Sequence, residues 1–307
     1  MSITVLNPGP QATLQGAARQ GLRQFGMPAS GAADPLAHAI ANRLVGRSPD
    51  ATGMEITFGP ASFRFERTMH AGIAGAETEI RIDGVFQPPG QTLHVPAGAT
   101  LSFSPFVAGA RAYLSVSGEM AATKSFGSAS TYLPASIGGH EGRALRKNDS
   151  IAVSEVFSAP VVRMPMELRF ALSHSYALRA VTGPDWQEGM QDQLGPFFVT
   201  QRLSRMGVEV EGGLAAISVA EMRPSSAVLP GALQVTPSGR GFLLLADGQT
   251  TGGYPHILQV IRADRHLLGQ LRPKDRIQFL LRSQTESEAA LLAKQKLLET
   301  WLPGFRL

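Results

Sequence analysis

Short apolar stretches, bounded by glycine, proline and polar residues, recur along most of the 307-residue chain. Stretches such as "SITVL", "MEITF", "SFRFE", "AYLSVS", "HILQVI" and "RIQFLL" each have the length of a strand. Glu79, Arg81 and Asp83 alternate with Ile80 and Ile82, as in a strand with one buried face. Many short strands separated by turn residues predict a mainly β protein of barrel or sandwich type.

Two segments have helical spacing instead. In residues 34–46 the apolar positions recur every three to four residues, with Asp34 placed as the N-cap. Residues 283–302 have a second such pattern, with Leu292 on its mainly apolar face, and we expect Thr285 and Glu288 to form a capping box. Neither helix has paired ligands on its polar face, so both are interpreted as packing elements.

The strand pattern is interrupted once, in "SAPVVRMPMELR", where two prolines stand close together. We therefore expect two β-rich halves. Residues 1–163 form the first, with one helix near 34–46, and residues 164–307 form the second, with the C-terminal helix. No sequence repeat of fixed period indicates a propeller or a solenoid.

Composition excludes several classes of chemistry. The chain has no cysteine, which excludes disulfides, thiol catalysis and iron–sulfur clusters, and its seven histidines lack the spacing of a metal site. A net charge of +4 without a basic cluster argues against nucleic-acid binding. The N-terminus has no signal-peptide pattern, and no apolar stretch reaches membrane-spanning length. We expect a soluble, cytoplasmic protein that binds no nucleic acid, membrane or metal.

The stretch "LLLADGQTTGGYPHILQVI" contains a polar loop that is longer than a hairpin turn requires. The residues expected to bind a substrate there are Gln249, Thr250, Thr251, Gly252, Gly253 and Tyr254. Glycines let the backbone approach a ligand, while the amide, the hydroxyls and the aromatic ring supply polar contacts and a flat wall. Asp247 is the candidate general base or cation anchor. We predict a small-molecule site in the C-terminal half.

Arg205, in "LSRMGVEVEG", precedes a predicted strand and is the second catalytic candidate, because a guanidinium can hold a carboxylate through two hydrogen bonds. A surface salt bridge would explain an arginine there equally well. The two candidates together fit a small amide or carboxylate substrate. We expect residues of a partner chain to complete the site, so the isolated chain should be inactive.

Three further segments contain candidate substrate-binding residues. Ser128 and Ser130 lie in "GSASTY", which lacks the second glycine of a nucleophile elbow but supplies hydroxyls. Arg143 follows two glycines in "SIGGHEGRAL", where backbone amides and a cation can bind an anion. Ser30 precedes the first helix, whose N-terminus favours negative charge. An ordinary loop or helix start remains the alternative for each.

Several motifs together resemble one family. "GMPASGAADPLAHAIANRLVG", "GARAYLSVSG", "SRMGVEVEG" and the segment ending in "ADGQTTGGYP" are similar to the biotin-dependent carboxyltransferase or allophanate hydrolase subunit 2 family. Its members include the 5-oxoprolinase C subunit, KipA and part of urea carboxylase. The resemblance implies a cyclophilin-like β-barrel, here in residues 164–307. It also implies ATP-dependent opening of 5-oxoproline to glutamate, with a B or KipI-type partner and an A-type third subunit.

Two other functions fit the same resemblance. One is biotin-dependent carboxyl transfer to a urea-like or amide substrate, with biotin on a separate carrier, because this chain has no Met-Lys dipeptide. The other is a non-catalytic KipA-type regulator of a kinase inhibitor. In either case we expect no cofactor bound by this chain itself, with ATP used by the complex.

The chain departs from the family pattern in two places. Where the family has Thr-Val-Gln-Asp-Leu-Gly-Arg, residues 13–19 have Gly16 in place of the acid. Where the family has Gly-Gly-Ile-Asp, this chain has Ser117, Gly118, Glu119 and Met120. If either acid works in catalysis or in partner contact, the chain acts on another substrate.

Overall fold

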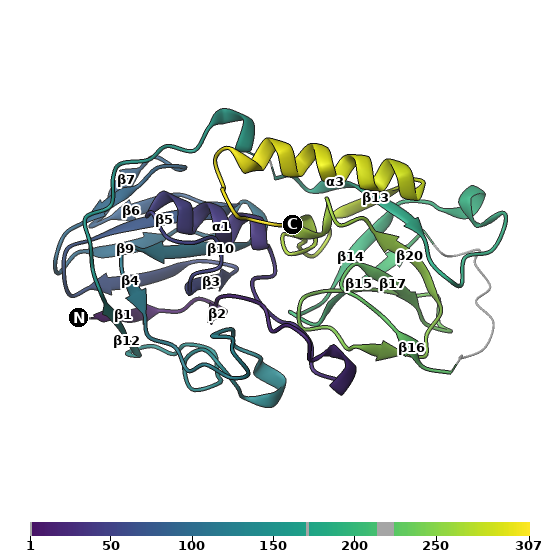
Figure 1. The fold of residues 1–307 in the computed structure, drawn as a ribbon, viewed down its shortest axis with the longest axis horizontal. Helices are drawn as coiled ribbons and strands as arrows, with labels where there is room; N and C mark the ends of the chain where they lie inside the picture. The colour runs from purple at the N-terminus through teal and green to yellow at the C-terminus, as the bar shows by residue number, and fades with distance from the viewer. Residues whose placement is uncertain (1, 170–171, 214–223) are drawn as a thin grey trace. The chain divides into compact units, whose positions relative to one another are not determined.

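The computed structural model describes residues 2–169, 172–213 and 224–307 of the chain. Contacts divide the chain into two compact units, here called unit 1 and unit 2 (Figure 1). Unit 1 comprises Met1–Arg19, Ser30–Leu172 and Leu298–Arg306. Unit 2 comprises Gln20–Ala29, Ser173–Leu297 and Leu307. Strands are the main regular structure of each unit, so the prediction of a mainly β protein with two β-rich halves is confirmed.

The long segment of unit 1 ends at Leu172, and the long segment of unit 2 begins at Ser173. The proline-rich segment before this point belongs to unit 1 because its backbone bonds to that unit: Met164 N donates to Gly90 O at 2.8 Å. Thr92 N likewise donates to Val162 O at 2.9 Å. The domain division between residues 163 and 164, drawn from the proline pattern, stays a prediction.

Unit 1 contains two sheets. The strands of the seven-stranded sheet are, in spatial order, β11 (Glu119–Met120), β12 (Ser150–Ser154), β1 (Ser2–Asn7), β4 (Ala61–Phe65), β9 (Thr100–Phe103), β6 (Ile80–Ile82) and β7 (Val85–Gln87). The strands of the five-stranded sheet are β2 (Gln11–Gln15), β3 (Gly53–Thr57), β10 (Ala108–Val116), β5 (Met69–Glu77) and β8 (Leu93–Val95). The strand pairs in these sheets are antiparallel, as expected for strands joined by short turns.

One apolar core joins the two sheets of unit 1. Phe63 and Leu101 come from the seven-stranded sheet, Ile56 and Leu114 from the other, and all four side chains are fully buried in the same cluster. Strand β12 alternates exposed and buried positions, which is the pattern of a strand with one face on a core. Unit 1 is therefore a β-sandwich.

Helix α1 (Pro35–Leu44) lies on the five-stranded sheet of unit 1 (Figure 1). The carboxylate of Asp34 accepts a hydrogen bond from Ala37 N at 2.9 Å, which confirms the predicted N-cap. The helix approaches strand β5 so closely that a Cβ on Gly72 would lie 2.2 Å from Ala41 O. Only glycine allows this contact between helix and sheet.

Unit 2 is a closed barrel. Its strands are, in order around the barrel, β13 (Ser175–Thr182), β20 (His256–Val260), β17 (Ala232–Val235), β18 (Gly241–Leu244), β15 (Gly207–Gly212), β14 (Phe197–Leu203) and β21 (Arg276–Leu281). β13 and β21 pair in parallel, and the other neighbours are antiparallel. Phe197 and Phe279 meet edge to face in its core, with ring centroids 5.1 Å apart. The predicted barrel in the C-terminal half is confirmed.

The remaining elements are short, apart from the C-terminal helix. They are β16 (Ser226–Ala227), β19 (Thr251–Gly252), α2 (Arg265–Leu268), α3 (Gln284–Glu299) and the 3-10 helices Arg23–Phe25, Leu133–Ala135, Met166–Leu168 and Met190–Gln193. The predicted capping box at Thr285 and Glu288 is wrong, because α3 begins earlier. Ser283 N donates to Glu286 Oε2 at 2.7 Å, and Glu286 N donates back to Ser283 Oγ at 3.2 Å.

Candidate functional site

A groove on the barrel of unit 2 has a volume of about 460 Å³. Its lining residues are Arg202, Leu203, Ser204, Met206, Gly207, Gln234, Phe242, Leu244, Gln249 and Tyr254. Gln249 and Tyr254 belong to the polar loop that the sequence singled out, and the others come from strands β14, β15, β17 and β18 or the turns between them. A loop on a rigid barrel is a common way to position binding groups.

Gln234 connects the loop to the barrel. This β17 residue is 1% exposed, and its side-chain Nε2 donates to the backbone oxygen of Tyr254 at 2.9 Å. Its Oε1 accepts a hydrogen bond from Gln249 Nε2 at 3.0 Å. The amide therefore binds both ends of the segment 249–254 and fixes the two loop residues that line the groove.

Gly252 is explained by the same amide. A Cβ at this position would lie 2.6 Å from Gln234 Nε2, which is closer than any side chain tolerates. The sequence predicted that the glycines open the backbone to a ligand, whereas the close approach at Gly252 is to Gln234 of the chain itself. Thr251 and Gly252 form the short strand β19, which pairs with β16. The loop is thus fixed both by the side chain of Gln234 and by the pairing of β19 with β16.

Asp247, the first residue of the loop 247–255, forms a buried ion pair with Arg205. Arg205 Nε donates to Asp247 Oδ2 at 2.8 Å and Nη2 donates to Oδ1 at 3.1 Å, with both side chains at most 3% exposed. The backbones join too, because Asp247 N donates to Arg205 O at 2.9 Å. The pair closes the loop against the turn between β14 and β15. Neither residue lines the groove, and the catalytic roles predicted for them stay predictions.

The other loop residues differ in exposure. Gln249 and Thr251 are exposed, and Tyr254 is 39% exposed and lines the groove. Thr250 is buried, and its backbone oxygen accepts from Val228 N at 3.0 Å. Gly253 is half-buried. The amide of Gln249 and the ring of Tyr254 are therefore the loop groups that a bound molecule can reach.

Arg202 is the charged residue among those that line the groove, and it is largely exposed. The carboxylate of Glu209 on β15 lies 3.5 Å from its guanidinium. Burial raises the pKa of Glu209, but hydrogen bonds from Thr200 and Arg240 lower it more, so the pKa lies below its ordinary value. A guanidinium, two amides and a phenol around an apolar floor suit a small molecule with carboxylate or amide groups.

The remaining predicted binding residues all lie in unit 1. Ser128 Oγ donates to Ala17 O at 2.5 Å, and Ser130 Oγ donates to Gly16 O at 3.1 Å. Ser130 Oγ also accepts from Gly16 N at 3.0 Å. These hydroxyls hold the loop of residues 125–130 to the segment after β2, so the structure gives them a structural role that the loop composition alone did not reveal.

Arg143 bonds to a neighbouring acid. Its guanidinium donates to both carboxylate oxygens of Asp149, at 2.7 and 3.0 Å. This hydrogen-bonded contact lowers the pKa of Asp149 to about 2. The side chain of Arg143 is 26% exposed, and it also contacts Glu141 at 3.0 Å. A bound anion would therefore compete with two carboxylates for this cation.

Ser30 stands apart from the other serines. Its backbone has a left-handed φ of 54°, its side chain is 5% exposed, and its Oγ has no hydrogen-bond partner among the described residues. It precedes helix α1, whose first turn is already capped by Asp34. Among the three predicted serines, Ser30 is the one whose hydroxyl has no hydrogen-bond partner in the described part of the chain.

Comparison with known proteins identifies the family. The carboxyltransferase domain family, subdomains A and B, matches residues 25–281. This chain belongs to that family. Its similarity to the 5-oxoprolinase C subunit of Escherichia coli (strain K12) is 33% identity over 300 residues, covering 95% of this chain and 94% of that relative. The corresponding 5-oxoprolinase chain of Haemophilus influenzae is 32% identical, covering 90% of each chain. The family resemblance of the sequence motifs is confirmed.

Solved structures agree with the sequence relatives. Urea amidolyase of Kluyveromyces lactis matches with a TM-score of 0.89 at 25% identity, covering all of this carboxyltransferase-domain chain and 20% of that protein. The structure of TTHA0988 matches with a TM-score of 0.82 at 31% identity, covering 91% of this chain and 55% of that one. The chain thus spans about half the length of one solved relative and a fifth of the other. None of the helices in the described residues is long and apolar enough to cross a membrane.

Proposed function

We propose that this chain is the C subunit of an ATP-dependent 5-oxoprolinase, which opens 5-oxoproline to glutamate. The observation that carries the proposal is the match to two proteins that both have the name of the 5-oxoprolinase C subunit, at 33% and 32% identity over nearly their whole length. A relative that aligns from end to end shares domain content as well as fold. The word subunit in both names supports a role within a hetero-oligomer.

The groove of unit 2 supports a substrate of this kind. 5-Oxoproline is a small ring with one carboxylate and one amide. Arg202 can bind a carboxylate, and the amide of Gln249 can donate to or accept from a ring amide. Gln234 keeps Gln249 and Tyr254 in place, so these contacts are preorganised.

A partner chain completes the site in this proposal. The groove of unit 2 is open to solvent and contains one guanidinium among its described lining residues, but ATP-driven hydrolysis also needs a phosphate-binding site. We assign that part to a B or KipI-type partner and an A-type subunit, and we expect no ATP binding by this chain alone. As in the sequence-based expectation, the isolated chain is inactive.

Reconstitution tests the proposal. The full chain is co-expressed with its B-type and A-type partners, and glutamate release from 5-oxoproline is measured with and without ATP. We expect release only with ATP and all three chains together. Turnover by this chain alone would refute the shared site, and an assembled complex that is inert toward 5-oxoproline would refute the substrate.

The alternative is biotin-dependent carboxyl transfer to a urea-like or amide substrate. It is favoured by the structural match to urea amidolyase, which covers the whole chain with a TM-score of 0.89. The same groove would then bind a urea-like molecule through the amide of Gln249, which Gln234 holds in place. Biotin would arrive on a separate carrier. Carboxylation of urea by the chain together with a biotinylated carrier, and no glutamate release, would establish this function instead.

A further inference from the structure

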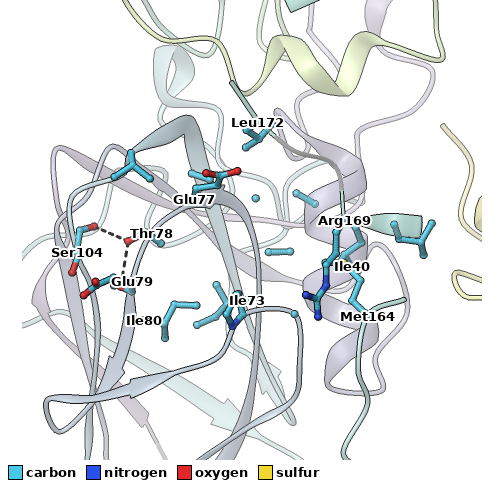
Figure 2. A pocket seen from close by; sticks show the side chains of 18 of the residues that line it. Ile40, Ile73, Glu77, Thr78, Glu79, Ile80, Ser104, Met164, Arg169 and Leu172 are labelled. Carbon is cyan, nitrogen blue, oxygen red and sulfur yellow. Dashed lines mark hydrogen bonds between the residues drawn. The ribbon is translucent and has the colours of Figure 1, made fainter. Parts of the chain in front are cut away.

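Unit 1 contains a second and larger cavity, with a volume of about 870 Å³. Helix α1, the end of strand β5, the β6–β7 hairpin and the segment of residues 164–169 surround it (Figure 2). Its large apolar lining residues include Leu36, Ile40, Ile73, Ile80, Phe86 and Leu168. Cavities of this size with mainly apolar walls are typical of small-molecule sites.

The polar groups on one side of this cavity already have partners. Thr78 Oγ1 donates to Ser104 O at 2.8 Å, as Figure 2 shows, and Glu79 forms an ion pair with Arg81 at 2.9 Å. These contacts occupy the hydroxyl of Thr78 and the carboxylate of Glu79. An occupant must therefore contact this side of the cavity mainly through apolar groups.

Arg169 differs from these residues. Within the described part of the chain its guanidinium forms no hydrogen bond or ion pair. Figure 2 shows its side chain reaching into the cavity beside Ile40 and Met164. The guanidinium lies against Gly90, where an added Cβ would be 3.5 Å from Arg169 Nη2. Arg169 is an exposed residue among the cavity's lining residues, and from there its guanidinium can bind an anionic group through two hydrogen bonds.

The mouth of the cavity is apolar as well. Phe86 is 53% exposed and Val107 is 65% exposed, and both line the cavity. Met166, which lies in sequence between the lining residues Met164 and Leu168, is 71% exposed. Exposed apolar side chains that continue into a cavity mark a binding surface more often than an accident of folding.

We propose that this cavity binds an amphipathic carboxylate of the medium-chain fatty acid class. The alkyl chain of the ligand occupies the space between α1 and β5, and its carboxylate is bound by Arg169. The carboxylate of Glu77, also on the wall, repels an anion and so directs the head group toward Arg169. This ligand differs in polarity from that of the barrel groove, and the proposal is independent of the proposed function.

Calorimetric titration of the full chain with decanoate, below its micelle-forming concentration, tests the proposal. We expect saturable binding of one decanoate, with decanol and decylamine each binding about tenfold more weakly, because neither has an anion for Arg169. Equal affinity for the three probes, or tighter binding of decylamine, would overturn the role of Arg169.

Two variants and one control distinguish the contribution of the ligand's head group to binding from that of its alkyl chain. Arg169→Gln should weaken decanoate about tenfold and leave decanol unchanged. Arg163→Gln removes the same charge just before this segment, at a position that does not line the cavity, and should change neither. Met164→Trp fills the cavity from the loop side and should abolish binding of all probes while the melting temperature is retained.

Two results would reject the site. Decanoate binding that survives Met164→Trp would place the ligand elsewhere on the chain. The other result is no saturable binding of any probe by the wild-type chain. In that case the small-ligand proposal fails, and loss of B-type partner binding in Phe86→Ser and Met164→Trp would indicate a docking surface for another protein.

Discussion

The guanidinium of Arg205 and the carboxylate of Asp247 form a two-bond ion pair inside unit 2, at 2.8 and 3.1 Å. The pair joins the turn after β14 to the first residue of the loop 247–255, and a backbone bond between the same residues reinforces it. Two residues that the sequence presented as independent catalytic candidates are thus partners of each other.

Breaking this pair should destabilise unit 2. Asp247→Ala leaves the Arg205 guanidinium buried beside an empty space, and we expect a loss of about 3–5 kcal/mol in the free energy of unfolding. The double variant Arg205→Leu with Asp247→Leu removes both charges and should lose less than Asp247→Ala. Urea unfolding of the three proteins measures this. If Asp247→Ala keeps wild-type stability and loses only activity, the carboxylate acts in catalysis.

Gln234 should determine substrate binding in the groove, because it fixes the positions of the loop residues Gln249 and Tyr254. Gln234→Leu removes the bonds to Gln249 and Tyr254, so the loop residues lose their fixed positions. In the reconstituted complex we expect about a tenfold lower kcat/KM for 5-oxoproline, because positioning is lost. Gln259→Leu is the matched control, since Gln259 Nε2 donates to Pro230 O at 2.9 Å and does not line the groove. Equal effects of the two variants would contradict a role for Gln234 in positioning.

His38 should make the protein sensitive to mild acid. Its imidazole is buried, and burial lowers its pKa to about 4, although Glu55 and Asp50 act in the opposite direction. Between pH 6.5 and 4 the unfolded chain binds a proton that the folded chain does not, so stability is full above pH 6.5 and falls as the pH drops. The expected loss is about 3 kcal/mol at pH 4.

The measurement is the free energy of unfolding at pH 7 and at pH 4.5. His38→Gln should reduce the difference between the two values, since glutamine has no proton to take up. His94→Gln changes an exposed histidine and should leave the difference as it is. An unchanged pH dependence in His38→Gln would show that other groups, such as His266, dominate; burial lowers the pKa of His266 to about 3.

Gly16→Asp restores the acid that the family pattern has at this position. A Cβ there would meet Thr52 Oγ1 at 3.4 Å and Asp50 O at 3.5 Å, which are ordinary contacts. Gly16 is buried, so the added carboxylate loses solvation, and we expect a loss of about 1–3 kcal/mol in unfolding free energy together with faster 5-oxoproline cleavage by the complex. Ala17→Asp, one residue away, is the control. A folded Gly16→Asp protein with an unchanged rate would mean that the acid is dispensable.

Local patterns predicted much of the fold. Alternation and strand length indicated the mainly β class, and Asp34 was recognised as an N-cap because a cap requires only the three residues that follow it. The start of α3 was misplaced by two residues, since Ser283 and Thr285 are equally good caps and only the fold selects one. Leu292, assigned to the apolar face, is 70% exposed.

The groove was predicted less completely, because its central residue carries a weak signal. Gln234 stands as one amide in the strand "GALQVT", where a polar residue ordinarily indicates the solvent face of a strand. Its burial and its two bonds depend on a loop that lies 15 to 20 residues later in the chain. Likewise, the sequence alone could not show which groups pair the hydroxyls of Ser128 and Ser130, because their partners lie more than 100 positions away.

Barrel closure restricts how another protein can attach to unit 2. Because β13 pairs with β21, each of the seven barrel strands has neighbours on both sides. An incoming polypeptide cannot extend this barrel by adding a strand, and it must bind through side chains and connecting loops. The two sheets of unit 1 end in the edge strands β11, β7, β2 and β8. A partner strand can therefore pair with the backbone of unit 1, whereas it cannot pair with the backbone of the closed barrel.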